Sequence, residues 1–227
     1  MRSDFADEHP ECEVIGTDLS PIPPEWVPPN LRFEIDDCTK DWTFSHNSFD
    51  FIHIRFLVGG IADWTHLFRQ AYHCCKPGGW VQSGEFEAII LSDDGTVNDQ
   101  TTMGTLWNKL LIEAGKKAGR SFLIKTENLQ RKGLEEAGFV DIQEVTYKSP
   151  INGWPKDPHL AEIGRYIELT MDNDIEGYTM YLWNQVMGWP MDEYQVFLML
   201  MRKEIRSKII HSYFYVRYVY GRKPETA

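Results

Sequence analysis

Acidic residues follow two predicted strands near the start of the chain. Asp18 ends the strand predicted over residues 13–18, and Asp36 and Asp37 come directly after the strand predicted over residues 31–35. Ligands of open parallel sheets bind beyond the carboxyl ends of strands. Asp18 could accept hydrogen bonds from the two ribose hydroxyls of a nucleoside, or cap the turn that follows. Asp36 and Asp37 could meet an adenine amino group, or simply end a strand.

A basic pair lies on a third predicted strand, residues 49–56. His53 and Arg55 are two positions apart, so their side chains face the same side of the sheet. His53 could act as a general base near pH 7; the alternative is a buried histidine that is hydrogen-bonded to backbone. Arg55 could neutralise a carboxylate, which would come from a ligand, from Asp18 or from Asp37.

Glu85 lies at the end of the strand predicted over residues 80–86. It could face a substrate, and the alternative is a solvated carboxylate. The preceding turn, residues 76–79, contains two glycines that permit a tight helix-to-strand connection. We interpret this turn as structural. His53 and Glu85 are therefore weak candidates for catalysis, and no catalytic residue is identified firmly.

Several motifs are absent from the sequence. The seven histidines form no H-x-x-x-H or H-E-x-x-H pair, so no metal site is predicted. The chain also contains no G-x-S-x-G, no G-x-x-x-x-G-K-[ST] and no G-x-G-x-x-G. The absence of G-x-G-x-x-G is a serious departure from the usual pattern of a nucleotide-binding α/β protein.

The elements that must position these side chains alternate between strands and helices, which predicts an α/β fold with a mainly parallel sheet. Asp63 and Thr126 are predicted N-caps, and Asp192 with Gln195 resembles a capping box. We expect a single domain over residues 1–227, with a helical insertion at about 153–189. Further strands are predicted over 139–147 and 213–220, and helices over 62–75, 100–118, 126–137, 160–171, 177–187 and 192–208.

Composition limits the possible partners. The net charge of −11 disfavours sequence-independent binding to nucleic acid. No stretch approaches the roughly 20 apolar residues of a membrane helix. The four cysteines form no C-x-x-C pair and the N-terminus has no apolar signal core, so we expect reduced thiols in an intracellular protein, cytoplasmic or nuclear. Aromatic residues gather in the C-terminal half, where they form core or line an apolar substrate pocket: Trp154, Tyr178, Tyr181, Trp183, Trp189 and Phe197.

Four segments together carry a family resemblance. They are V-I-G-T-D-L-S-P-I at 14–22, W-V-P-P-N-L-R-F-E-I-D-D at 26–37, N-S-F-D-F-I-H at 47–53 with Arg55, and K-P-G-G-W at 76–80. In order and spacing the chain resembles the fungal LaeA-like, or UMTA-type, class I methyltransferases that depend on S-adenosylmethionine. The resemblance covers almost the whole chain, and it implies a Rossmann-like sheet with helices on both faces.

The resemblance also implies roles for particular residues. Asp18 matches the acid that binds the ribose of the cofactor, and Leu19 would pack on the adenine. Asp37 and Cys38 match positions beside the adenine ring, with Asp36 close by. Arg55 matches a position near the methionine end of S-adenosylmethionine. Many such enzymes work chiefly by holding the acceptor in line with the methyl group.

One departure from the family concerns the beginning of the fold. The family opens with a strand and a glycine-rich turn of the type D-I-G-T-G-T-G, and Met1 of this chain falls after them. The missing strand is the central one, between the strands that hold Asp18 and His53. We expect a truncated chain that binds the cofactor poorly; a genuine short form and a degenerate, non-catalytic member are the alternatives.

Two functions follow from the resemblance. The first is methylation of a small-molecule secondary metabolite. The second is regulation of secondary metabolism through protein partners, with little or no catalysis. Both would use the same cofactor residues, so the sequence does not separate them.

Overall fold

The computed structural model describes residues 2–20 and 26–226. The chain divides into two compact units, Met1–Ser45 and His46–Ala227, and each is described by itself. Residues 21–25 of the predicted proline-rich loop lie outside the described residues. The expectation of a single domain stays a prediction.

The first unit contains one helix and one pair of strands. Helix α1 spans Arg2–Glu8, and strands β1 (Val14–Asp18) and β2 (Leu31–Ile35) pair in parallel. The side-chain amide of Asn30 donates to the carbonyl oxygens of Ala6, His9 and Cys12 at 2.9–3.0 Å. One side chain thus ties the end of α1 and the turn after it to the start of β2.

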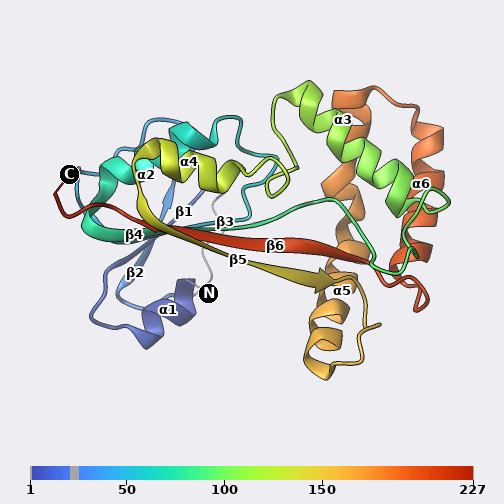
Figure 1. Ribbon diagram of the computed structural model, residues 1–227, viewed down its shortest axis with the longest axis horizontal. Coiled ribbons are helices and arrows are strands. Elements are labelled where there is room, and N and C mark those ends of the chain that lie inside the picture. Colours follow the sequence, from blue (N-terminus) through green and yellow to red (C-terminus); the bar gives the residue numbers. More distant parts are fainter. Residues whose placement is uncertain (1, 21–25, 227) are drawn as a thin grey trace. The chain divides into compact units, whose positions relative to one another are not determined.

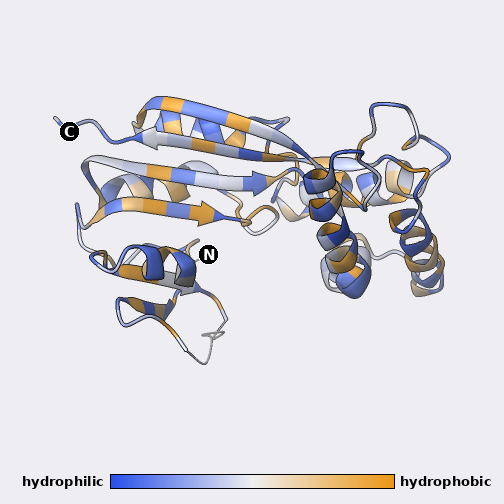
Figure 2. Cartoon of the chain, turned by 90° about the horizontal axis from the view of Figure 1, so that it is seen from below, coloured by the Kyte–Doolittle hydropathy of each residue, from blue (hydrophilic) through white to orange (hydrophobic). Residues whose placement is uncertain are grey.

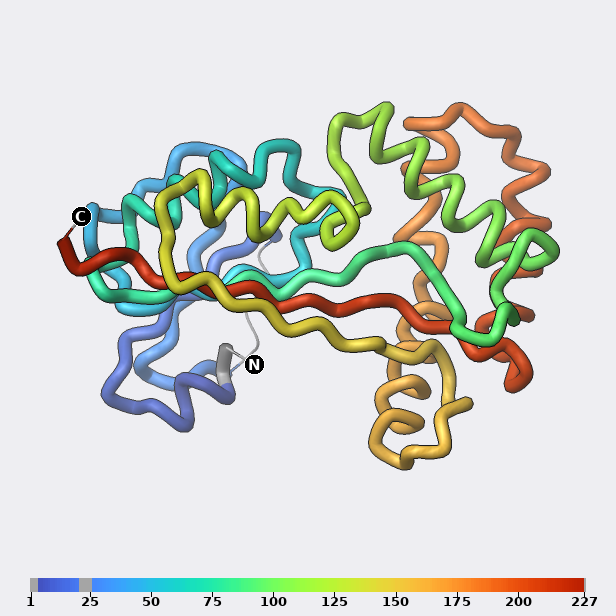
Figure 3. The backbone as a smooth tube through the Cα atoms, in the orientation of Figure 1, coloured from blue at the N-terminus to red at the C-terminus, as the bar shows by residue number. Residues whose placement is uncertain are grey.

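The second unit is built on a four-stranded sheet in the order β3-β4-β6-β5 (Figure 1). The strands are β3 (Phe49–Arg55), β4 (Cys75–Phe86), β5 (Val140–Pro150) and β6 (Tyr213–Arg222). β3 and β4 are parallel, and β6 runs antiparallel to both β4 and β5. Three of the four strands therefore share one direction, as the predicted mainly parallel sheet requires. Figure 3 shows the long β5 and β6 running side by side.

Two helices cover one face of this sheet, α2 (Trp64–Cys74) and α4 (Leu129–Ala137) (Figure 1). α2 buries a stripe with helical spacing that includes Leu67, Phe68 and Ala71. Its predicted N-cap is confirmed, because the Asp63 carboxylate accepts from the backbone N–H of His66 at 2.8 Å. Figure 2 shows that the helices carry both hydrophobic and hydrophilic residues.

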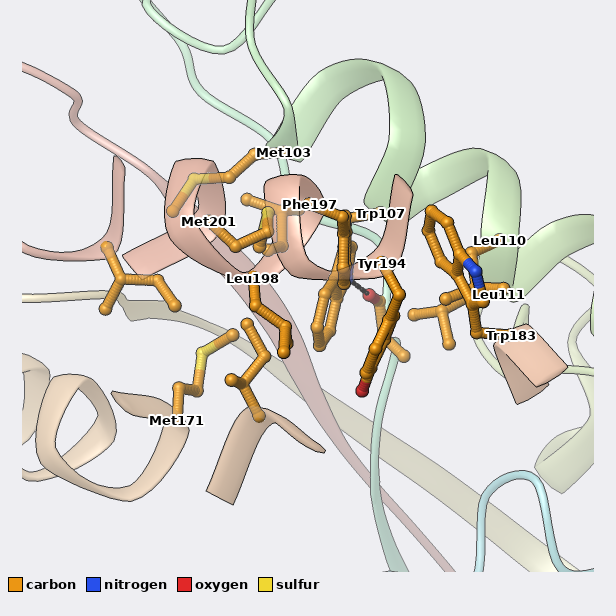
Figure 4. Close-up of a cluster of buried hydrophobic side chains, with 14 of the residues drawn as sticks. Met103, Trp107, Leu110, Leu111, Met171, Trp183, Tyr194, Phe197, Leu198 and Met201 are labelled. Atoms are coloured by element: carbon orange, nitrogen blue, oxygen red, sulfur yellow. Dashed lines mark hydrogen bonds between the residues drawn. The ribbon is translucent and has the colours of Figure 1, made fainter. Parts of the chain in front are cut away.

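A helical layer surrounds a second hydrophobic core. It contains a π-helical turn η1 (Met103–Trp107), α3 (Asn108–Ala118), α5 (Pro158–Met180), a π-helical turn η2 (Tyr181–Met187) and α6 (Met191–Ile205). Trp183 stacks near Tyr194 and Phe197, with ring centroids 5.3 and 5.0 Å away (Figure 4). Trp183 and Phe197 are therefore core residues, whereas Tyr178 and Tyr181 are exposed.

Several local predictions are wrong. Thr126 does not cap α4, because its N–H and hydroxyl bind the Glu87 carboxylate and Asn128 occupies the cap position instead. The predicted capping box at Asp192 is absent: α6 begins at Met191, and Pro190 is its N-cap without a side-chain hydrogen bond. The two helices predicted over 160–171 and 177–187 form α5, which bends at Asp174, and η2.

The strands that hold Asp18 and His53 belong to different sheets. β1 pairs with β2, and in the described part of the chain β3 pairs with β4 alone. Among the described residues, no helix is both long and apolar enough to cross a membrane.

Candidate functional site

The first group of predicted site residues lies at the carboxyl ends of β1 and β2. Asp18 is opposite Ile35 in the strand register. The backbone N–H of Asp36 donates to the carbonyl oxygen of Asp18 at 3.0 Å. Parallel pairing thus brings Asp18 and the Asp36–Asp37 pair to one edge of the sheet, as the sequence predicted.

The three carboxylates of this edge support the turns around them. Asp18 Oδ1 accepts from the N–H of Ser20 at 3.1 Å, and Asp36 Oδ1 accepts from the N–H of Asp37 at 2.9 Å. Asp37 Oδ1 accepts from the N–H and the hydroxyl of Thr39 at 3.0 and 2.7 Å. The capping interpretation of Asp18 is therefore correct. It leaves a ligand role open, because Asp18 is exposed and its Oδ2 receives no hydrogen bond from the described residues.

Apolar side chains flank the acidic edge. Leu19 is 67% exposed and Ile35 is 68% exposed. Exposed large apolar residues beside carboxylates provide a surface on which a flat base can pack. Ile35 is a residue that the sequence reasoning missed. Its signal was its place as the last residue of the strand, directly before Asp36.

Cys38 completes this edge and is half-buried. Burial raises the pKa of its thiol, and the negative charge of Asp37 raises it further. The thiol therefore stays neutral near pH 7, which suits a packing or weak hydrogen-bonding role better than nucleophilic chemistry. Among the described residues, no group of three or more His, Cys, Asp or Glu could hold a metal ion.

A second group of predicted residues lies in the other unit, at the end of β3. His53 is half-buried, and its Nδ1 lies 3.0 Å from Oε1 of Gln82 on β4. In the tautomer that carries its proton on Nδ1, this nitrogen donates to the Gln82 amide oxygen and Nε2 is the acceptor nitrogen of the ring. This contact joins the ring to a side chain of the neighbouring strand, and the role of His53 stays a prediction.

Arg55 and the loop after it form an unusual local structure. The Arg55 guanidinium is exposed and lies 4.3 Å from the centroid of the Phe56 ring. Phe56 adopts a positive φ of +56°, which is strained for a bulky side chain. Its ring meets Phe86 edge-on, with centroids 5.5 Å apart. The chain therefore turns sharply at the carboxyl end of β3.

Glu85 holds that turn in place. Its side chain is fully buried. Oε2 accepts from the N–H groups of Leu57 and Val58 at 2.8 and 3.0 Å, and Oε1 from Leu57 at 3.1 Å. Burial raises the pKa of Glu85 to about 7, and the backbone donors and the Arg55 charge oppose that rise. The alternative of a solvated carboxylate is therefore wrong, and the direct contact with substrate predicted for Glu85 gives way to support of the loop.

The edge formed by β1 and β2 has hydrogen-bond acceptors that suit an adenosine. Carboxylate oxygens can accept from ribose hydroxyls and from an adenine amino group, and exposed Leu19 and Ile35 can contact the base. The residues present thus fit the adenosine half of a nucleoside cofactor. Fold and edge together are those of an α/β protein that has room for a nucleoside at the carboxyl ends of two parallel strands.

Comparison with known proteins is consistent with this class. The family described as "Methyltransferase domain" matches residues 4–144. Methyltransferase pytC of Aspergillus terreus is 36% identical over 97% of this chain and 67% of its own length. The secondary metabolism regulator LAE1 of Cochliobolus heterostrophus is 34% identical over 98% of this chain and 72% of its own.

Solved structures also resemble the chain. Phosphoethanolamine N-methyltransferase 2 of Haemonchus contortus, in complex with phosphomonomethylethanolamine and S-adenosylhomocysteine, has a TM-score of 0.48 at 17% identity. The match covers 97% of this chain and 46% of that one, so the chain spans less than half of that enzyme's length.

The chain belongs to the methyltransferase domain family, and its sequence similarity places it with the LaeA-like members. S-Adenosylmethionine is the cofactor of this family.

Proposed function

We propose that the protein methylates a small-molecule secondary metabolite with S-adenosylmethionine. The observation that carries this proposal is the acidic edge of the β1–β2 pair, where Asp18 and Asp36 lie on adjacent strand ends. Its supports are the family membership and the 36% identity to methyltransferase pytC.

The residues of the edge divide the binding of adenosine among them. Asp18 accepts from the ribose hydroxyls through the carboxylate oxygen that the turn does not use. Leu19 and Ile35 pack on the adenine. Asp36, Asp37 and the neutral thiol of Cys38 lie beside the ring and orient it. The bound cofactor supplies the methyl group.

The second group of residues serves the methionine end and the acceptor. Arg55 offers a guanidinium to the methionine carboxylate of the cofactor. His53 is the candidate base, and its ring is oriented by the contact between its Nδ1 and Gln82. Glu85 keeps the loop after Arg55 in shape and contacts neither reactant. The chain would act chiefly by orienting the acceptor.

A titration of S-adenosylmethionine followed by calorimetry tests the ribose assignment. Asp18→Ala removes a charged acceptor of two hydrogen bonds, each worth about 1.5–3 kcal/mol, so affinity should fall by about 10-fold or more. Glu8→Ala, an exposed acidic residue at the end of α1, is the matched control and should leave affinity unchanged. Equal affinities of wild type and Asp18→Ala would contradict the assignment.

We also propose that the affinity of these 227 residues for the cofactor is weak, because they contain no glycine-rich turn. Such turns allow the backbone to approach a cofactor closely. A dissociation constant above about 1 mM in the same titration would agree with this proposal, and a value below about 10 μM would contradict it.

A second candidate function is regulation of secondary metabolism through protein partners. The observation that favours it is the 34% identity to the regulator LAE1 over nearly the whole chain. Affinity capture that returns regulatory proteins, with no methyl transfer to any metabolite, would support this candidate. Methyl transfer to a metabolite that is retained in wild type and lost in Asp18→Ala would favour the first.

A further inference from the structure

Helix α6 carries apolar side chains on two opposite faces. One face packs into the core of the helical layer, through Tyr194, Phe197, Leu198, Met201 and Ile205. On the opposite face Val196 is 52% exposed and Met199 is 62% exposed. A surface helix ordinarily carries charged and polar residues on the side away from its buried face. The proposed function uses neither of these exposed apolar residues.

These two residues lie at the centre of a stripe along the outer face of α6. The stripe consists of four exposed residues, Asp192, Val196, Met199 and Lys203. Each is separated from the next by three or four positions, and this spacing places side chains on one face of a helix. The stripe is therefore acidic at its start, apolar at its centre and basic at its end.

The stripe is complementary to itself when two copies of α6 run antiparallel. With a two-fold axis between positions 197 and 198, Asp192 of each copy lies opposite Lys203 of the other, and Val196 lies opposite Met199. Within the described residues neither Asp192 nor Lys203 forms an ion pair, so both charges are available. A parallel pairing would instead place like charges opposite each other. Because complementary charges fix the register of an interface, the stripe favours the antiparallel arrangement.

The neighbouring helix α5 widens the apolar surface. The two helices lie side by side in the helical layer (Figure 1). They are joined by an ion pair between Asp172 of α5 and Arg206 of α6, with 2.7 Å between the nitrogen and the oxygen. Leu169 precedes Asp172 by one helical turn, so it lies on the same side of α5, and it is 57% exposed. The exposed apolar surface therefore extends from α6 onto α5.

We propose that the α6 stripe, flanked by Leu169, binds the same stripe of a second copy of this chain and forms a two-fold symmetric dimer. The 15 residues of α6 span about 22 Å, so the contact is small compared with the roughly 800 Å² that each partner of a standard complex buries. The dimer should therefore be weak. The surface contains none of the residues proposed to bind the cofactor, so its failure and the failure of the proposed function are distinguishable.

Sedimentation equilibrium at low ionic strength tests the proposal. Wild type should dimerise with a dissociation constant of about 10–200 μM. Met199→Asp places a charge at the apolar centre and should weaken the dimer about tenfold or more. Lys203→Glu sets two carboxylates opposite each other at both ends of the stripe and should weaken it about fivefold or more. Lys117→Glu makes the same change of charge on an exposed residue of α3 and should alter the constant less than about twofold.

An exchange of the two charges tests the antiparallel register itself. The double variant Asp192→Lys with Lys203→Glu again places opposite charges across the dimer, so its dissociation constant should return to within about threefold of wild type. Circular dichroism of each variant confirms that it is folded. Wild type that stays monomeric at about 500 μM would overturn the proposal and assign the stripe to a different occupant. Unchanged dimerisation of Met199→Asp, or a folded double variant that dimerises no better than Lys203→Glu, would also overturn it.

Discussion

Protonation of Glu85 should make the stability of the protein depend on pH around neutrality. Its fully buried carboxylate accepts from Leu57 and Val58 N–H groups, with Arg55 nearby and Arg217 opposite it in the β4–β6 register. Burial raises the pKa of Glu85 from an ordinary 4.5 to about 7. The folded state therefore holds the proton more tightly than the unfolded state.

The sign and size of the effect follow from that difference. A raised pKa in the folded state contributes stability below pH 4.5 that is lost as the pH rises through 7. Linkage between these two pKa values gives a loss of about 2 kcal/mol in the free energy of unfolding between pH 5.5 and pH 8. Glu85→Gln removes the titration and keeps the shape of the side chain, so this part of the pH dependence should disappear.

Urea unfolding of wild type and Glu85→Gln at pH 5.5 and pH 8 measures the effect. Between pH 5.5 and pH 8, the free energy of unfolding of wild type should fall by about 2 kcal/mol relative to that of Glu85→Gln. Because other groups titrate equally in both proteins, their contributions cancel. A difference that stays constant with pH, or that shifts in favour of wild type, would refute the reasoning.

Two further predictions concern stability. Asp63→Ala removes the N-cap bond to His66 and should cost about 1 kcal/mol in the same urea assay, with a loss below about 0.3 kcal/mol contradicting it. Lys223 is buried, and its ammonium donates to Asn47 Oδ1 and to the carbonyl oxygens of Tyr72 and Cys75. Lys223→Met leaves these acceptors unpaired and should lower the free energy of unfolding by about 3 kcal/mol. A urea unfolding midpoint equal to that of wild type would show that the ammonium contributes nothing to stability.

Much of the fold could be predicted because its signals are local. Apolar and charged residues alternate over Leu31–Ile35, which predicts β2. The helical spacing of apolar residues after Asp63 predicts α2. The failures occurred where a distant residue decides the structure. The sequence predicts Thr126 as a helix N-cap, but its N–H and hydroxyl donate to the carboxylate of Glu87, 39 positions away.

The candidate site divides in the same way. Asp18, Asp36 and Asp37 could be proposed because they lie at the ends of strands that the sequence marks clearly. Glu85 was misjudged because its burial depends on β6 and on the turn at Phe56, which strand patterns do not reveal.

Adenosine binding observed by NMR tests the central claim most directly, because it detects weak binding. Titration of adenosine to about 10 mM into the isotope-labelled chain should shift the backbone amide signals of residues 18–20 and 36–39, and Asp18→Ala should abolish these shifts. Signals of wild type that stay unmoved in both segments, or that move equally in Asp18→Ala, would contradict the assignment of this edge to the cofactor.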